Sequence, residues 1–487
     1  MNILLIDVNP DFSVKDKGAY DLAATFPPVG LMYIASYLKK RLGERIKVKV
    51  LHEIIDSSSP AETAGILQRF RPDIVGIRGL NIFRKRFHEV AQLAKETLGD
   101  VIVVGGGPYV TMSFEDAALD ENLDYLVTGE GEITFTALIE ALLQGRSGQD
   151  VDGLSYRRDA EMVKASPRAF IEDLDALPFP DYSLSEIDHY AGLSNYGFNR
   201  RRQGIILSSR GCPGRCIFCH RIFGQKTRAR SPENVFREIE SLHRDFGIKD
   251  FYFIDDNFSH DYQRATDILE LIIRSGMEAR IYFRNGLRAD TIDADFIDKM
   301  KEAGCVSACF AIETAAPRLQ KLIGKNLDLN KAAENIDYAC ERGIMVGSFA
   351  MIGFPSETKE EALGTIEYFR QFKKLVLPML FCVKYHPNTE IYDLALSHGI
   401  KADLVKDAYA ESYHDIAHSQ TPLISNRDFK WLFSKFLREV VLSEERLANA
   451  LKIQKRLQTK EEMQSVYKSY LKEDIGDLEK EIFSYGR

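Results

Sequence analysis

Short runs of β-branched residues alternate with longer helical stretches in two successive series along the chain. A chain of this kind folds into parallel sheets covered by helices. The 487 residues are 45% apolar and 28% charged, which excludes collagen-like, low-complexity and wholly disordered chains. At roughly 100 to 200 residues per domain, this length predicts two or three domains.

The first series runs from Asn2 to about Leu143 and predicts a Rossmann-like domain over residues 1–145. We expect its five strands at Ile3–Ile6, Val48–His52, Ile74–Ile77, Val101–Val104 and Tyr125–Val127. Ligands of doubly wound sheets bind at the carboxyl ends of the strands. The glycines at 105–107 and 129–131 follow two of these strands, so we expect them at that edge.

The second series predicts a full or partial (βα)6 barrel over residues 201–390, after a proline-containing linker with some strand content at 146–200. Its strands are expected at Ile205–Ser209, Phe251–Ile254, Ile281–Asn285, Val306–Ile312, Met345–Met351 and Met379–Lys384. Residues 391–487 are predicted to be helical, with one helix beginning behind a capping box from Ser425 to Asp428.

Charge and hydropathy narrow the possible partners and compartment. The formal net charge of −8 argues against nucleic acid as a partner. The longest apolar stretch, Gly343 to Phe354, is far shorter than the ~20 residues of a membrane-spanning helix. The first residues lack a basic segment followed by a long apolar one, so we expect a cytoplasmic protein with no transmembrane segment.

Three of the seven cysteines stand close together just after the first predicted barrel strand, at Cys212, Cys216 and Cys219. Glycine and proline keep this loop out of a helix, so the three thiolates can converge on one soft metal centre. Zinc would need a fourth ligand, which His220 could supply, whereas a four-iron cluster would keep one iron open. The spacing does not choose between the two. The other cysteines, at 305, 309, 340 and 382, are predicted to be small core residues.

The sequence Cys-x-x-x-Cys-x-aromatic-Cys after the first strand of such a barrel resembles the radical S-adenosylmethionine (SAM) superfamily, over roughly Arg201 to Pro387. Agreement extends to Asp255-Asp-Asn257, to Glu313 with Lys325 beyond it, and to the stretch Gly347–Pro355. The resemblance implies that the three cysteines hold a [4Fe-4S] cluster. One electron from it would cleave SAM and leave a 5′-deoxyadenosyl radical, which abstracts hydrogen from the substrate.

The same resemblance implies roles for residues around the cluster. Phe218 would offer an apolar face, Gly353 would let the backbone approach adenine, and Glu313 could accept bonds from a ribose hydroxyl or an ammonium. The residues expected to bind SAM are Phe218, Glu313, Thr314, Gly347, Ile352 and Gly353. Asp255 and Asp256 fit either a ligand role or a helix cap, and no catalytic residue is assigned.

The first domain resembles the cobalamin-binding domain found ahead of the barrel in one branch of that superfamily. The similar stretches are Phe26–Tyr37, Ile74–Ile77, Val103–Tyr109 and Val127–Glu132, and Ile171–Pro180 resembles the branch's connector. The resemblance implies that cobalamin would be bound by Gly30, Gly105, Gly106, Gly107, Tyr109 and Glu130. Two positions depart from the usual corrinoid motifs: Asn9 replaces the axial histidine, and Arg78 stands where a serine hydroxyl meets the nucleotide tail.

These resemblances together imply a radical SAM enzyme that uses cobalamin to methylate an unactivated carbon of a small or medium-sized metabolite. A flavodoxin- or ferredoxin-type protein would supply the electron. One alternative is a radical cyclase or dehydratase whose cobalamin-like domain is empty or repurposed. A second alternative, from another class, is a non-catalytic corrinoid- or metal-binding sensor.

Overall fold

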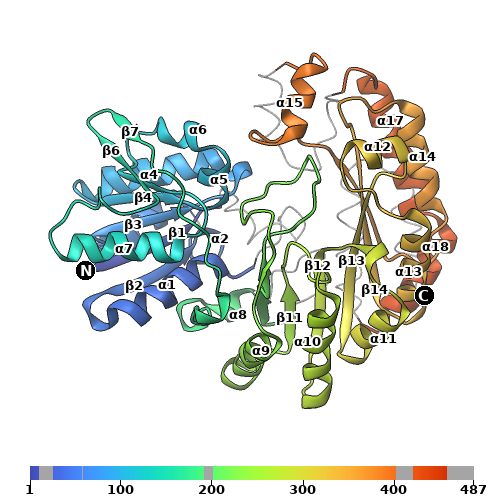
Figure 1. Cartoon of the computed structure of the whole chain (residues 1–487), viewed down its shortest axis with the longest axis horizontal. Coiled ribbons are helices and arrows are strands. Elements are labelled where there is room, and N and C mark those ends of the chain that lie inside the picture. Colours follow the sequence, from blue (N-terminus) through green and yellow to red (C-terminus); the bar gives the residue numbers. More distant parts are fainter. Residues whose placement is uncertain (10–25, 58, 191–200, 402–420, 458–487) are drawn as a thin grey trace. The chain divides into compact units, whose positions relative to one another are not determined.

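The computed structural model describes residues 1–9, 26–57, 59–190, 201–401 and 421–457. These residues form two compact units. The first contains the described residues up to Tyr190 together with His220–Phe223, and the second contains the rest from residue 201 onward. Figure 1 shows the course of the chain within each unit.

The first unit is built on a seven-stranded sheet in the order β2-β1-β3-β4-β5-β6-β7. The strands are β1 (Asn2–Asp7), β2 (Lys47–His52), β3 (Ile74–Arg78), β4 (Ile102–Gly106), β5 (Tyr125–Val127), β6 (Leu154–Arg158) and β7 (Glu161–Val163). The first five are parallel and confirm the Rossmann-like prediction. The last two pair antiparallel beyond β5, so part of the segment predicted as a linker extends this sheet.

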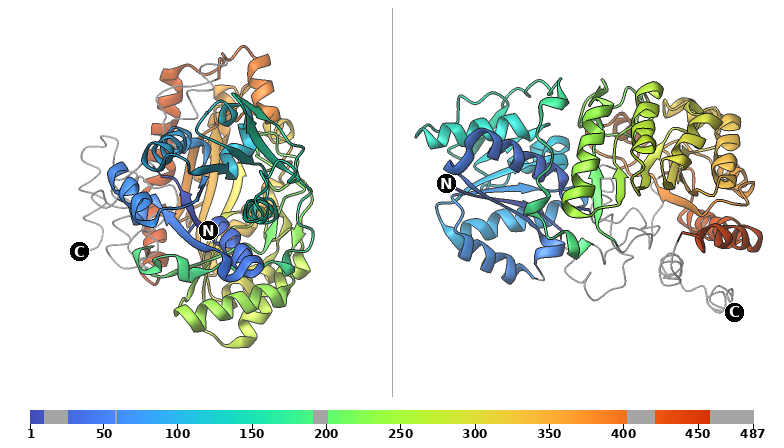
Figure 2. Two further views of the ribbon diagram at one scale, coloured as in Figure 1. Left: turned by 90° about the vertical axis from the view of Figure 1, so that its left-hand side faces the viewer. Right: turned by 90° about the horizontal axis from the view of Figure 1, so that it is seen from below.

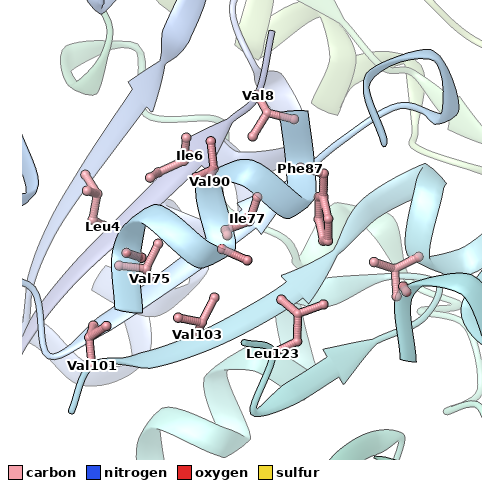
Figure 3. Packing of buried hydrophobic residues seen from close by; sticks show 14 of the residues in the cluster. Leu4, Ile6, Val8, Val75, Ile77, Phe87, Val90, Val101, Val103 and Leu123 are labelled. Atoms are coloured by element: carbon pink, nitrogen blue, oxygen red, sulfur yellow. The ribbon is translucent and has the colours of Figure 1, made fainter. Parts of the chain in front are cut away.

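Helices cover both faces of this sheet. They are α1 (Val29–Leu42), α2 (Glu53–Asp56), α3 (Pro60–Phe70), α4 (Arg84–Leu98), α5 (Gly107–Met112), α6 (Phe114–Ala118), α7 (Gly131–Leu143) and α8 (Ile187–Tyr190). The apolar residues of α1 and α7 pack on one face, and those of α3, α4 and α5 pack on the other. Figure 3 shows this second cluster, in which Phe87 and Val90 of α4 lie over Val75, Ile77 and Val103. Burial on both faces explains the nearly continuous apolar strands.

The second unit contains a six-stranded parallel sheet in the order β15-β14-β13-β12-β11-β8, which confirms the partial-barrel prediction. Its strands are β8 (Gln203–Ile206), β11 (Asp250–Phe253), β12 (Arg280–Leu287), β13 (Cys305–Glu313), β14 (Met345–Ile352) and β15 (Leu377–Cys382). A separate short ribbon pairs β9 (Ser209–Arg210) with β10 (Arg228–Ala229) and encloses the cysteine loop.

Helices between the strands cover one face of this sheet (Figures 1 and 2). They are α9 (Pro232–Phe246), α10 (Tyr262–Ser275), α11 (Ala294–Glu302), α13 (Leu329–Glu341) and α14 (Lys359–Arg370). One further helix, α12 (Pro317–Leu322), lay outside the sequence prediction because it is too short for a clear helical period. The helix α15 (Glu390–Ser397) falls in the C-terminal region that was predicted to be helical.

The described end of the chain is helical, as predicted. It contains α17 (Asn426–Phe436), a π-helical turn at Leu437–Val441 and α18 (Glu444–Gln454). Ser425 caps α17 by accepting a hydrogen bond from the Asp428 N–H at 3.1 Å. Predictions for residues 458–487 lie outside the described residues. Among the helices of the described part, none is long and apolar enough to cross a membrane.

Candidate functional site

The cysteine loop follows β9, and within it Cys216 lies close to both Cys212 and Cys219. A Cβ atom built on Gly214 would lie 3.3 Å from the Sγ of Cys212 and 4.0 Å from that of Cys216. The Gly214 N–H donates to the Cys212 sulfur at 3.4 Å. A hydrogen bond from Cys219 lowers the pKa of Cys216 to about 7. The loop therefore holds one thiol that ionises readily next to two others, as a thiolate-bound centre requires.

The cysteine loop can hold an iron–sulfur cluster, which spreads its cysteine ligands over several irons. Three protein thiolates, from Cys212, Cys216 and Cys219, would leave one iron of a four-iron cluster open.

Two aspartates fix the strand that enters the cysteine loop. The Asp255 carboxylate accepts bonds from the Ser208 and Ser209 hydroxyls at 2.6 and 2.5 Å. The Asp256 carboxylate accepts the Gly211 N–H at 2.9 Å. The residue that caps α10 is Asp261, so the two aspartates anchor the loop instead of capping this helix. Sequence reasoning left this open because the partners lie more than 40 residues away.

The far side of the loop is bound to the turn after α12. The Ile217 N–H donates to the Ile323 carbonyl at 3.0 Å. A Cβ on Gly324 would lie only 2.5 Å from the Arg215 carbonyl oxygen, and this glycine has φ +70°. Only glycine fits this close approach without strain. Phe218 packs against an apolar cluster that contains Leu319 and Ile323.

A buried ion pair stands beside the cysteine loop. The Lys325 ammonium donates to the Glu313 carboxylate at 2.7 Å, and both side chains are close to fully buried. Their charges act on the thiols, because Lys325 and Glu313 both shift the pKa values of Cys216 and Cys219. Glu313 has φ +66°, which is uncommon for a residue other than glycine. The structure thus places the predicted SAM-binding carboxylate next to the predicted cluster.

Other residues predicted to bind SAM are engaged in packing. Thr314 is fully buried, and its hydroxyl lies 3.2 Å from that of Thr365. A Cβ on Gly347 would lie 2.7 Å from the Cys309 sulfur, so this glycine is required by strand packing. Ile352 is fully buried. Their binding roles stay predictions. The four cysteines outside the loop are buried, as predicted.

The glycine loop after β14 is held by a buried acid. The Glu357 carboxylate accepts the N–H groups of Gly353 and Phe354, and the Tyr385 hydroxyl donates to the Gly353 carbonyl. Burial raises the pKa of Glu357 to about 8. Gly353 has φ +99°, so its conformation requires glycine. Sequence reasoning missed Glu357, although it follows the quoted stretch by only two residues.

At the edge of the first sheet, Nη1 of Arg78 donates to both carboxylate oxygens of Asp7, at 2.8 and 2.9 Å. A Cβ on Gly107 would meet the Arg78 side chain at 2.6 Å, so Gly107 makes room for this arginine. The guanidinium therefore stands at the carboxyl ends of β1 and β3, where the sequence placed it.

Asn9 lies at the same edge and is buried. Its N–H donates to Glu53 at 3.3 Å, and Arg86 pairs with Glu53 at 2.7 Å within the core. His52, which ends β2, bonds to the Tyr190 hydroxyl at 2.8 Å, and burial lowers its pKa to about 4. The imidazole that ends β2 is thus neutral and already bonded.

Several residues predicted to bind cobalamin serve the fold. The buried Tyr109 hydroxyl bonds to His88 at 2.7 Å and donates to Asp116 at 2.8 Å. The Glu130 carboxylate accepts the Ile171 N–H at 2.7 Å, so it holds the predicted connector. A Cβ on Gly105 would meet Leu126 and Phe87 below 3.0 Å. Cobalamin binding by these three residues stays a prediction.

The remaining two glycines predicted to bind cobalamin, Gly30 in α1 and Gly106 at the end of β4, have open space beside their backbone. A Cβ on Gly30 would meet nothing within 4 Å, and one on Gly106 would meet nothing closer than 3.6 Å. Backbone without side chains is what a bulky flat group needs for close approach. Because Asn9 stands at the histidine position, this motif would offer no imidazole to a bound corrinoid.

Comparison with known proteins agrees with this geometry. A family model described as Radical SAM superfamily matches residues 206–369, and one described as B12 binding domain matches residues 20–139. An uncharacterized methyltransferase of Pyrococcus horikoshii is 32% identical over 448 residues, which are 91% of this chain and 94% of the relative.

Two further proteins extend the comparison. The cytidylyl-2-hydroxyethylphosphonate methyltransferase of Streptomyces wedmorensis is 29% identical, over 72% of this chain and 74% of its own. Among solved structures, the radical SAM methyltransferase TsrM of Kitasatospora setae, with cobalamin and a [4Fe-4S] cluster bound, has the same fold. Its TM-score is 0.63 at 20% identity, over 80% of this chain and 73% of that one.

Proposed function

Because the chain belongs to the radical SAM superfamily, in the branch with an N-terminal B12-binding domain, we propose that it methylates an unactivated carbon of a small or medium-sized metabolite. It is a radical SAM enzyme, and its cofactors are a [4Fe-4S] cluster, SAM and cobalamin. The observation that carries the methylation proposal is the likeness to a methyltransferase over 91% of the chain.

When bound, the cluster supplies the electron that cleaves SAM, and cobalamin carries the methyl group. Cys212, Cys216 and Cys219 would hold the cluster in a loop that Asp255 and Asp256 keep in place. These anchors fix the thiols before the cofactor arrives, which is the preorganisation a reactive centre needs.

Two parts of the second unit would orient SAM. The Glu313 carboxylate would accept a hydrogen bond from a hydroxyl or the ammonium of SAM, and Lys325 would hold this carboxylate in place. The Gly353 backbone would lie against the adenine, and the buried Glu357 and Tyr385 would hold the loop that contains it in place. In the first unit, Gly30 and Gly106 would let the corrinoid approach the backbone closely.

One anaerobic preparation tests the proposal. Iron and sulfide are measured, the visible spectrum is recorded with hydroxocobalamin, and dithionite-driven release of 5′-deoxyadenosine is assayed. We expect about four irons per chain, corrinoid absorbance that survives gel filtration, and nucleoside release. A protein with one zinc and no iron would overturn the proposal. Iron without retained corrinoid would favour ring formation or dehydration over methylation. We also expect a flavodoxin or ferredoxin to replace dithionite as the electron donor.

A further inference from the structure

Gln320 is a buried residue of α12, and its side-chain amide forms hydrogen bonds with the backbone at the end of β13. Its Nε2 donates to the Ile312 carbonyl at 2.8 Å and to the Thr314 carbonyl at 2.6 Å. These are the residues directly before and after Glu313. Both hydrogens of the amide are therefore used to hold the backbone on either side of one carboxylate.

The backbone at Glu313 needs such support. Its φ of +66° lies in the left-handed region, which is unfavourable for a residue with a side chain. The register between β13 and β14 also shifts between Ala311 and Glu313. Irregularities of this kind re-aim a side chain, and strained backbone of this kind persists only where neighbouring contacts hold it.

Gln320 also shapes the turn that carries Lys325. Its side-chain oxygen accepts the Leu327 N–H at 3.1 Å. Its backbone carbonyl accepts the N–H groups of Lys325 and Asn326 at 3.2 and 3.1 Å. One residue thus fixes both the strand end that presents the carboxylate and the turn that presents the ammonium.

The two charges held in this way lie beside the cysteine loop. Lys325 and Glu313 are bonded at 2.7 Å, and the turn before Lys325 is bound to the loop, because the Ile217 N–H donates to the Ile323 carbonyl at 3.0 Å. The Lys325 ammonium engages one carboxylate oxygen, Oε1. The other oxygen of Glu313 makes no hydrogen bond with any described residue of the protein, so it remains available to a ligand beside the loop.

We propose that Gln320 is a positioning residue for SAM, which holds the Glu313 carboxylate and the Lys325 ammonium as one preformed pair beside the cluster. This inference depends on the proposed function in that it takes SAM as the ligand. A loose carboxylate would have to be ordered when SAM binds, and that entropy cost would weaken binding.

The test compares two amide-to-acid substitutions in the reconstituted full chain. Gln320→Glu removes the amide donors and places an acid oxygen against two carbonyls. Asn335→Asp is the matched control, because the buried Asn335 amide donates to the Ala289 and Ile292 carbonyls at 2.8 and 2.9 Å, where it supports no charged pair. We expect both variants to unfold at lower urea concentration than the wild type.

Only Gln320→Glu should weaken equilibrium binding of SAM, by about tenfold, which equals ~1.4 kcal/mol, with iron content unchanged. Its KM for SAM should rise more than its kcat falls. If Gln320→Glu does not fold, Gln320→Asn keeps the amide but shortens it by one methylene, and a smaller rise in KM is expected. Unchanged SAM affinity in the folded, iron-loaded Gln320 variant, or equal losses in Asn335→Asp, would overturn the inference. A wild-type protein that holds iron but binds no SAM would instead overturn the proposed function.

Discussion

Glu357→Gln should change how the stability of the second unit depends on pH. The Glu357 carboxyl is fully buried and accepts the Gly353 and Phe354 N–H groups, and burial raises its pKa from 4.5 to about 8. The folded chain therefore keeps this proton up to about pH 8, whereas the unfolded chain loses it near pH 4.5. The contribution of this carboxyl to the free energy of unfolding is fully present below pH 4.5 and is lost as the pH rises through 8.

The magnitude follows from the two pKa values. At roughly 1.4 kcal/mol for each pKa unit, the difference between 4.5 and about 8 corresponds to about 5 kcal/mol across the titration. A glutamine at this position accepts the same two N–H groups and has no proton to lose. The free energy of unfolding of the wild type should therefore fall, relative to that of Glu357→Gln, by up to this amount between pH 5 and pH 9.

Urea unfolding followed by the fluorescence of Trp431 measures this difference. It is the single tryptophan of the chain and lies on α17, which packs against α14, the helix that begins just after Glu357. Glu361→Gln is the control, because the ion pair with Arg318 lowers the pKa of Glu361. The contribution of Glu361 to the free energy of unfolding is therefore lost only as the pH falls below about 4.5. If the free energies of unfolding of the wild type and Glu357→Gln differ by a constant amount from pH 5 to pH 9, the assignment of Glu357 as a buried acid is wrong.

Three further outcomes follow from contacts described above. Cys216→Ala should abolish iron binding, cluster colour and nucleoside release, whereas Cys340→Ala, which changes a buried core thiol, should leave all three unchanged. Equal losses in the two variants would refute the ligand assignment. Gly324→Ala should lower iron retention after gel filtration, because its Cβ would lie 2.5 Å from a carbonyl of the cysteine loop; full retention would contradict this contact. Arg86→Met should reduce the free energy of unfolding by about 3–5 kcal/mol, since it leaves the buried Glu53 unpaired, and a loss below ~1 kcal/mol would count against a buried pair.

Much of the fold could be read from the sequence because it depends on local periodicity. The predicted strands of both sheets coincide with the observed ones to within a few residues. The short helix α12 was missed, since six residues give too little periodicity. The antiparallel strands β6 and β7 fall in a segment predicted to be a linker with some strand content, and their place in the sheet was not predicted because it depends on the pairing of β6 with β5.

The candidate site could be predicted from the sequence only where its residues lie close together in the chain. Cys212, Cys216 and Cys219 are recognisable from spacing because they lie in one short loop. The partners of Asp255 and of Tyr109 are not, because a carboxylate or a hydroxyl can bond to almost any polar group that the fold brings near.

By itself, the sequence determined the two βα domains and the cysteine loop, because strand periodicity and ligand spacing act over a few residues. Only the tertiary structure decided how Glu313 is aimed, since its conformation is held by Gln320 and its charge by Lys325, seven and twelve residues away. It also decided that Arg78 pairs with Asp7 across neighbouring strands. Such bonds are chosen by which backbone and side-chain groups the packed strands and turns bring together, and no local pattern records that choice.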